Sequence, residues 1–221
     1  MDDAFDFSFD DMDANVTPPL RQLLREQLAP AHAWLETSPI VSALFDGDFD
    51  RLQYQRLLWG MKSGFCQIEQ HLRSFQSDFE QAGLVDFAIR NRKCERLDAD
   101  LKQLRQMGEP ALCLHSVPGF VTLRNVSAAA GALYVLEGST QGARRIAPLL
   151  EKRLGADLPL TFYRGEGEAT EEMWQTFCQW LDQAEIDPHE AVLAGMEVFV
   201  RLRQQLVRAE TEAVECGRCV L

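Results

Sequence analysis

Three glycines interrupt an otherwise helical pattern in the run Gly131-Ala132-Leu133-Tyr134-Val135-Leu136-Glu137-Gly138-Ser139-Thr140-Gln141-Gly142. Each glycine inside a helix costs about 1 kcal/mol relative to alanine. Gly138 and Gly142 are four residues apart, so they share one face of the helix and expose a strip of backbone there. Such a strip suits two uses, which are close packing of a neighbouring helix and contact with a flat, bulky ligand.

A histidine near the N-terminus is the second candidate for chemistry. The apolar residues around it recur at helical spacing: Leu20, Leu24, Leu28, Ala31 and Leu35. His32 follows Ala31 by one position, so we expect it at the border of the buried face and not pointing to solvent. Neutral imidazole is a good iron ligand, and its second nitrogen then needs a partner that orients the ring. A lone histidine on a helix is more often an ordinary polar residue, so the surrounding motif has to decide.

The two segments together resemble the heme oxygenases, most closely the bacterial biliverdin-forming enzymes associated with bacteriophytochromes. In that family an early helix reads roughly Leu-Arg/Lys-x-x-Thr-x-x-x-His-x-x-x-Glu, and Leu24, Arg25, His32 and Glu36 occupy matching positions. The distal helix of the bacterial members reads close to Gly-x-x-Tyr-Val-x-Glu-Gly-Ser-x-x-Gly-Gly, which this chain matches over residues 131–142. Weaker similarities extend the match to about residues 20–210, at Asp100-Leu101, Trp174, Phe177 and Phe199.

The resemblance implies an enzyme that cleaves heme oxidatively to biliverdin, carbon monoxide and iron. It implies that His32 ligates the iron and that Arg25 faces a heme propionate, where a fixed cation pairs well with a carboxylate. It places Gly138, Ser139 and Gly142 on the distal wall, where the glycines contact the heme and steer bound oxygen. We expect the Ser139 hydroxyl to anchor water there or to bond back to its own helix. Heme is then both substrate and cofactor.

Other reactants and partners follow from the same resemblance. The reaction needs dioxygen and an external electron donor, and the sequence has no flavin or iron–sulfur motif of its own. The resemblance therefore implies a reductase or ferredoxin as electron donor, and it allows a bilin acceptor such as a bacteriophytochrome. Glu36, one turn after His32, is the expected partner that orients the imidazole.

Two departures from the family pattern keep a second function open. Leu28 stands where the family commonly has Thr, and Gln141-Gly142-Ala143 replaces a usual Leu-Gly-Gly. These changes favour a non-catalytic heme or bilin carrier as the alternative. A di-iron enzyme on the same fold is a further alternative, but such enzymes use Glu-x-x-His pairs on facing helices. No such pair occurs in the sequence, and Glu69-x-His71 cannot place both side chains on one helical face.

Helical periodicity indicates an all-α, single-domain multi-helix bundle, and the resemblance implies that this bundle is heme oxygenase-like. The 221 residues are 46% hydrophobic, with a net charge of −12 that argues against a nucleic-acid surface. No run approaches the roughly 20 apolar residues of a membrane span, and the start Met1-Asp2-Asp3 lacks the basic and apolar regions typical of a signal peptide. We therefore expect a cytoplasmic protein with no membrane contact. The domains expected are an acidic, disordered tail (1–16), a helical domain (17–212) and a tail containing a CxxC motif (213–221).

The spacing of apolar residues predicts six or seven helices. Their expected ranges are about 17–36, 48 or 50 to 81, 84–106, 120–153, 168–181 and 188–208. Pro30 is expected to kink its helix, Pro148 is expected to kink or split its helix, and residues 160–163 are expected to be extended. Six cysteines in a chain of this length do not form a disulfide scaffold. We expect Cys66, Cys94, Cys113 and Cys178 to be buried or half-buried thiols, and Cys216 and Cys219 to be exposed thiols or a redox or metal-handling pair.

Overall fold

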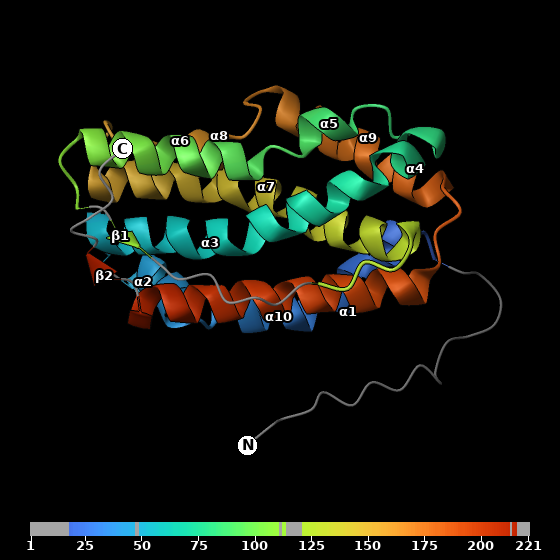
Figure 1. The fold of residues 1–221 in the computed structure, drawn as a ribbon, viewed down its shortest axis with the longest axis horizontal. Helices are drawn as coiled ribbons and strands as arrows, with labels where there is room; N and C mark the ends of the chain where they lie inside the picture. The colour runs from blue at the N-terminus through green and yellow to red at the C-terminus, as the bar shows by residue number, and fades with distance from the viewer. Residues whose placement is uncertain (1–17, 47–48, 111, 114–120, 213, 216–221) are drawn as a thin grey trace, which may run out of the picture.

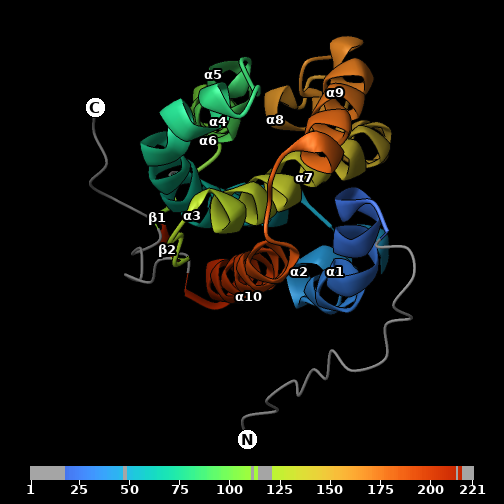
Figure 2. The same ribbon diagram turned by 90° about the vertical axis from the view of Figure 1, so that its right-hand side faces the viewer.

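The computed structural model describes residues 18–46, 49–110, 112–113, 121–212 and 214–215. Its frame consists of four long helices (Figure 1): α1 (Leu20–Glu36), α3 (Arg51–Leu72), α7 (Val126–Leu154) and α10 (Pro188–Glu212). Helix α10 packs against the other three, so it is the helix around which the bundle is assembled. Seen end-on, α10 lies on one side of α7, and the shorter helices of the upper layer lie on the other side (Figure 2).

Shorter elements complete the bundle: α2 (Pro39–Asp46), η1 (Arg73–Phe75), α4 (Gln76–Gln81), α5 (Phe87–Arg90), α6 (Lys93–Gln106), α8 (Thr161–Arg164) and α9 (Ala169–Gln183). Two two-residue strands, β1 (Leu112–Cys113) and β2 (Val214–Glu215), pair antiparallel with Leu112 opposite Glu215. The all-α prediction is therefore confirmed. The described helices outnumber the six or seven expected, because two of the predicted long helices are interrupted and because α2 and α8 form where no helix was expected.

Carboxylates from other parts of the chain start two of the helices that the sequence did not predict. The predicted helix over 84–106 is two helices, α5 and α6, and a buried carboxylate from α3 caps the second of them. The segment 160–163, expected to be extended, belongs mainly to α8. Its first turn forms because the Asp100 carboxylate accepts hydrogen bonds from the backbone N–H groups of Thr161 (2.7 Å) and Phe162 (2.9 Å).

Capping side chains fix where the two central helices begin. Asp50 starts α3 through a capping box, in which its carboxylate accepts from the N–H of Gln53 and the Gln53 side chain accepts from the N–H of Asp50, both at 2.8 Å. Helix α7 starts later than expected because the Asn125 side chain accepts from the N–H of Ala128 at 2.8 Å. Helices α1 and α7 both continue through their prolines, Pro30 and Pro148, so neither proline splits its helix.

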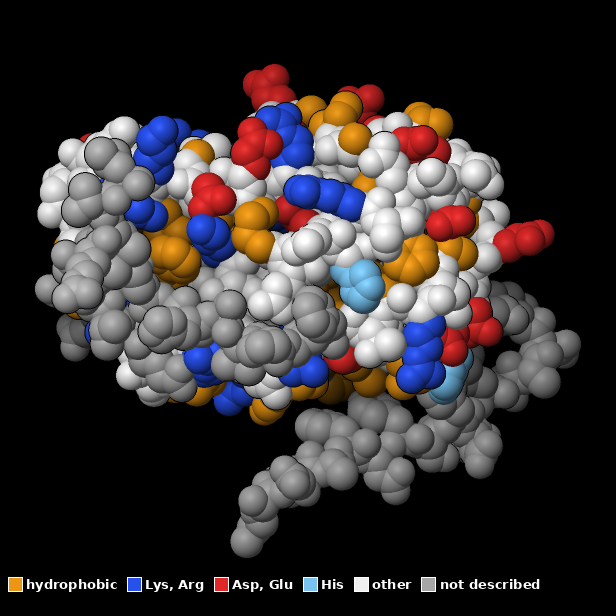
Figure 3. Space-filling view, in the orientation of Figure 1, with side chains coloured by type: hydrophobic (Ala, Val, Ile, Leu, Met, Phe, Trp, Pro, Cys, Tyr) orange, Lys and Arg blue, Asp and Glu red, His pale blue; other side chains and the backbone are white. Residues whose placement is uncertain are grey.

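The core lies between the four long helices and under the upper layer. Its largest fully buried side chains are Tyr54, Phe65, Phe79, Phe87 and Phe177. None of the described helices is long and apolar enough to cross a membrane. Acidic and basic side chains are interspersed over the face that Figure 3 shows.

One cysteine prediction is wrong. Cys66 of α3 and Cys94 of α6 form a disulfide, because these helices pack together and bring the two Cα atoms to 5.1 Å. Cys178, on α9, is a buried free thiol as expected. The acidic tail, Cys216 and Cys219 lie outside the described residues.

Candidate functional site

The glycines of α7 fall into two structural classes. A Cβ atom added at Gly131 would lie 1.9 Å from the carbonyl oxygen of Ala191 on α10, so this glycine is required for helix packing. A Cβ atom added at Gly142 would meet nothing within 4 Å, and one at Gly138 would meet only a ring atom of Trp174 at 3.9 Å. The backbone at Gly138 and Gly142 is therefore bare, and no neighbouring helix packs closely against it. We call the face of α7 at these two residues the glycine strip.

The departures from the family pattern point away from the glycine strip. Ala143 is buried, and the Gln141 side chain donates a hydrogen bond to the Thr170 carbonyl oxygen at 3.4 Å, on the α9 side. Leu28 is buried against α10, where it fills the space beside Gly195: a Cβ added there would lie 2.7 Å from the Leu28 side chain. These three residues are therefore explained by packing and leave the glycine strip open.

Ser139 follows the first residue of the glycine strip and is half-buried. Its hydroxyl donates to the carbonyl oxygen of Leu136 at 2.6 Å, which is the back-bonded arrangement common for serine in helices. Its proton is thus engaged within α7. A water at this position would have to donate to the Ser139 oxygen.

His32 lies near the C-terminal end of α1. Its ring meets Phe199 of α10 edge-on, with ring centroids 5.7 Å apart, and its Nδ1 lies 3.6 Å from a carboxylate oxygen of Glu36. The side chain is 57% exposed, which is more open than the sequence led us to expect, because it has Phe199 on one side and no described helix covering the other. Among the described residues, Nε2 of His32 has no hydrogen-bond partner.

Arg25 lies two turns before His32 on α1 and is exposed. No acidic side chain of the described residues forms an ion pair with it, but its charge acts on Tyr134 of α7. Burial raises the pKa of the Tyr134 phenol to about 12, with Arg25 lowering it slightly. The Tyr134 ring packs against Trp174, the same residue that borders Gly138. In the described part of the chain, Arg25 is therefore a cation without an acidic partner, and Tyr134 of α7 is a phenol that stays protonated.

Helices α1 and α7 are both supported by α10 and share no extensive interface with each other. Both helices pack beside Gly195 of α10, where an added Cβ would meet the side chain of Leu28 from α1 and, at 3.5 Å, the carbonyl oxygen of Gly131 from α7. No hydrogen bond, ion pair or ring contact in the described part of the chain joins His32 to Gly138 or Gly142. Within the described residues, Arg25 is thus linked to α7 only through the effect of its charge on Tyr134, and His32 and the glycine strip have no direct contact.

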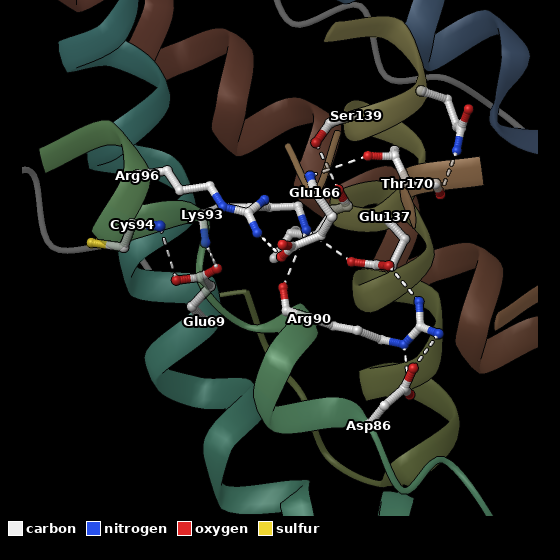
Figure 4. Close-up of polar contacts among 12 residues, drawn as sticks. Glu69, Asp86, Arg90, Lys93, Cys94, Arg96, Glu137, Ser139, Glu166 and Thr170 are labelled. Atoms are coloured by element: carbon white, nitrogen blue, oxygen red, sulfur yellow. Dashed lines mark hydrogen bonds and ion pairs between the residues drawn. The ribbon is translucent and has the colours of Figure 1, made fainter. Parts of the chain in front are cut away.

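A cluster of buried charges lies on another side of α7 (Figure 4). The carboxylate of Glu137, the residue before the glycine strip, accepts from Lys93 Nζ and from the Arg90 guanidinium, each at 2.8 Å. Arg90 also donates to both carboxylate oxygens of Asp86, at 2.8 and 2.6 Å. Burial lowers the pKa of Arg90, but Asp86 and Glu137 more than offset this, so its pKa lies above the ordinary value. We call Arg90, Lys93 and Glu137 the charge clamp.

A second ion pair and a small cavity lie next to the charge clamp. Arg96 of α6 pairs with Glu166, whose N–H donates to the Thr170 hydroxyl at 3.1 Å. A cavity of about 20 Å³ lies among these residues and the clamp. A second cavity, of about 490 Å³, opens beside α8. His32 lines neither of them.

Sequence reasoning found the glycine strip but missed the clamp. Glu137 lies inside the matched motif, yet its partners are separated from it by 44 and 47 residues, so no spacing rule connects them. Trp174 and Phe199, two positions of weaker similarity, border Gly138 and His32. Within the described residues, no group of three or more His, Cys, Asp or Glu side chains is arranged to hold a metal ion.

Comparison with known proteins gives the fold. No family model and no curated protein sequence matches the chain. Among solved structures, the heme oxygenase of Leptospira interrogans is similar, with a TM-score of 0.61 and 13% identity over 86% of this chain and 99% of that one. Heme oxygenase-1 of the cyanobacterium Synechocystis, solved in complex with heme, has a TM-score of 0.64 and 14% identity over 86% of this chain and 91% of that one. The chain therefore has the heme oxygenase fold.

Proposed function

We propose that this protein is a heme oxygenase, which cleaves heme to biliverdin, carbon monoxide and iron with dioxygen and electrons from a separate donor. The observation that carries the proposal is the glycine strip. Gly131 is packed against another helix, whereas Gly138 and Gly142 expose bare backbone on a helix that loses about 1 kcal/mol at each of them. A flat ligand that must lie within van der Waals distance of the main chain accounts for this arrangement.

The other residues of the site suit the chemical groups of heme. His32 offers a free Nε2 for the iron, while Glu36 lies beside Nδ1, where a carboxylate orients a ligating imidazole. Arg25 has no acidic partner among the described residues and can pair with a propionate, and the half-buried phenol of Tyr134 stays protonated and can donate to the same group. Phe199 supports the His32 ring.

In this proposal the protein contributes binding, orientation and exclusion of side reactions. Heme, when bound, supplies both the iron that activates dioxygen and the ring that is oxidised. The glycine strip limits the space on one side of the ring, and Ser139 can accept a hydrogen bond from water there while its own proton stays on Leu136. Residues 17–212 form the heme oxygenase domain. A reductase or ferredoxin delivers the electrons, and a bilin acceptor such as a bacteriophytochrome can take the product.

Two alternatives have less support from the site. The carrier hypothesis rested on Leu28, Gln141 and Ala143, which the structure explains by packing away from the glycine strip. A di-iron enzyme needs carboxylates and histidines that converge from facing helices, and the described residues contain no such group.

Hemin titration followed by reduction in air tests the proposal. We expect the wild-type protein to develop a Soret band that decays into broad bilin absorption once an electron donor is added. His32→Ala should lose the ligated spectrum, and its turnover should fall by more than the roughly 10–100-fold that follows the loss of a residue that only orients a ligand. His189→Ala, a histidine replaced at the start of α10, is the matched control and should behave like the wild type.

The outcomes separate the hypotheses. A hemin complex that is reduced but never bleaches would identify a carrier. Wild-type spectra and turnover in His32→Ala would refute His32 as the ligand. A wild-type protein that causes no Soret shift would refute heme as the ligand altogether.

A further inference from the structure

We propose that Glu137 is a positioning residue: held between Arg90 and Lys93, it sets the rotation of α7 and thereby the placement of the glycine strip against the heme. The inference rests on the proposed function, which assigns the strip to the distal wall. It adds a role for three buried charged residues that lie outside the heme-facing surface. These residues act through α7 and not by touching the ligand.

The first step of the argument is helical geometry. Glu137 directly precedes Gly138, and consecutive residues of an α-helix point about 100° apart. A carboxylate fixed on the α5–α6 side of α7 therefore determines the direction in which Gly138 faces. Gly142, one turn further on, turns with it.

The second step is that the carboxylate is held at two points. One oxygen accepts from Lys93 of α6 and the other from Arg90 of α5, both at 2.8 Å. Because the two donors come from different helices, Glu137 cannot move toward one of them without losing the other. A single ion pair would leave the Glu137 side chain free to rotate about that contact, whereas two contacts from different helices prevent this rotation.

The third step is that both donors are fixed themselves. Arg90 is bound by the two oxygens of Asp86 and lies 5.7 Å from the centre of the Phe177 ring. The side chains of Arg90, Lys93 and Glu137 are only 0%, 4% and 8% exposed. Ion pairs at such depth are screened little by water or salt, so the clamp resists displacement.

The fourth step connects Lys93 to the core of the bundle. Glu69 of α3 accepts hydrogen bonds from the backbone N–H groups of Lys93 (2.5 Å) and Cys94 (3.1 Å). The disulfide between Cys66 and Cys94 ties the same turn of α6 to α3. Helix α3 thus supports the first turn of α6. Lys93 lies in that turn and binds Glu137, the residue next to the glycine strip.

Energetics favour a positioning role over a purely stabilising one. A buried ion pair is expensive to desolvate and is often matched or exceeded in stability by apolar residues of similar volume. Glycines on the other side of the same turns leave α7 free to bend there. A costly, doubly anchored carboxylate at the first of these turns is therefore best explained by the placement that it enforces.

Three variants separate positioning from stability. Glu137→Met leaves Lys93 buried without its carboxylate, so we expect a lower Tm. The double variant Glu137→Met/Lys93→Met removes both charges and leaves Arg90 paired with Asp86, so most of the Tm should return. Glu166→Gln is the control, since it breaks an ion pair of the same charged layer that does not involve α7.

Two measurements are made on each variant. Hydrogen exchange of the unliganded protein reports on α7 directly, and we expect about tenfold faster exchange over residues 136–142 in the double variant. The biliverdin isomer ratio of the hemin-loaded enzyme reports on placement, and we expect it to change in the double variant although stability has recovered. Glu166→Gln should leave both unchanged.

Wild-type exchange and a wild-type isomer ratio in the double variant would overturn the proposal, because the clamp would then be only structural. If the wild-type protein binds no hemin, the proposed function fails by itself. The exchange measurement then still decides whether the clamp fixes α7: faster exchange confined to this helix supports it, and unchanged exchange overturns it.

Discussion

Gly131 and Gly142 lie on the same helix, about three turns apart, in opposite surroundings. At Gly131 the carbonyl of Ala191 occupies the place where a side chain would begin, and at Gly142 that place is empty. Gly131 is therefore required for helix packing, whereas Gly142 lowers the stability of its helix without any packing requirement. A substitution by the same residue at both positions distinguishes them.

We expect Gly142→Ala to raise the free energy of unfolding by about 1 kcal/mol, because alanine has the higher helix propensity and its methyl group meets nothing. Gly131→Ala should lower it by roughly 1–3 kcal/mol or more, because its methyl group overlaps the backbone of α10. Urea unfolding of both variants measures the difference.

A change of the same sign in both variants would contradict the two-class description. Hemin titration of the stabilised Gly142→Ala protein adds a functional readout. We expect its affinity for hemin to fall, since the added methyl group stands on the glycine strip. A variant that gains stability and keeps full affinity would place the ligand elsewhere.

At this scale, helical spacing predicted that Gly138 and Gly142 share one face, and the role of His32 as an iron ligand stays a prediction of the resemblance. The expectation that His32 does not point to solvent was wrong, since exposure depends on which helices flank the ring and the side chain is 57% exposed. It left two states open for the Ser139 hydroxyl, and the structure shows the back-bonded one.

Among the elements, α6 shows most clearly what a sequence pattern lacks. Apolar periodicity continues from Leu84 to Gln106, yet helix α5 ends at Arg90 and a new helix, α6, begins at Lys93. The cap of this new helix is the Glu69 carboxylate, supplied by α3 from 24 residues earlier in the chain. Local rules recognise caps such as Asp50 and Asn125, which lie beside the helix they start. They cannot recognise a cap that comes from another helix.

The buried cap makes α6 sensitive to pH. Burial raises the pKa of the Glu69 carboxyl above its ordinary 4.5, although the N–H groups of Cys94 and Lys93 and nearby cations partly oppose this. The folded state therefore holds a proton at pH values where the unfolded state has lost it. Relative to Glu69→Gln, the wild type should lose stability as the pH rises from 4.5 through the raised pKa, and show no further change above it.

Denaturant unfolding of both proteins at several pH values measures this difference. Using the difference removes the contributions of all other titrating groups, provided that they are the same in both proteins. A wild type that gains stability over Glu69→Gln across this range would show that the two backbone hydrogen bonds outweigh burial.

For the molecule as a whole, the tyrosines report on the integrity of the core. All three, Tyr54, Tyr134 and Tyr163, are described, and burial is the largest cause of a raised pKa in each. The folded protein therefore keeps phenolic protons that the unfolded chain loses near pH 10. Their stabilising contribution is full below pH 10 and disappears as the pH rises further.

An alkaline titration tests this expectation. The phenolate absorbance should stay absent near pH 10 while the helical circular dichroism is intact, and the two signals should then change together. Phenolate absorbance that appears near pH 10 in a fully helical protein would mean that the tyrosines reach solvent without unfolding.

The global fold was predictable because one motif at each end of the site, together with uniform helical periodicity, indicated the heme oxygenase fold. The contacts that hold the helices together were not. The sequence predicts Cys66 and Cys94 as separate thiols, and only the packing of α3 against α6 shows that they pair. The partners of Glu137 likewise follow only from the positions of α5 and α6. The sequence pattern shows which face of each helix is apolar, and tertiary packing determines which of these helix faces come into contact.

Helix α10 supports both α1 and α7, and it carries Phe199, which backs the ring of His32. During synthesis on the ribosome, α1 emerges first, and α10 begins about 150 residues after α1 ends. Until then the nascent chain lacks both the helix on which α1 and α7 pack and the aromatic neighbour of the histidine. On the proposed function, heme cannot load before translation has passed α10, because a chain cut short before this helix would present His32 without Phe199 beside it.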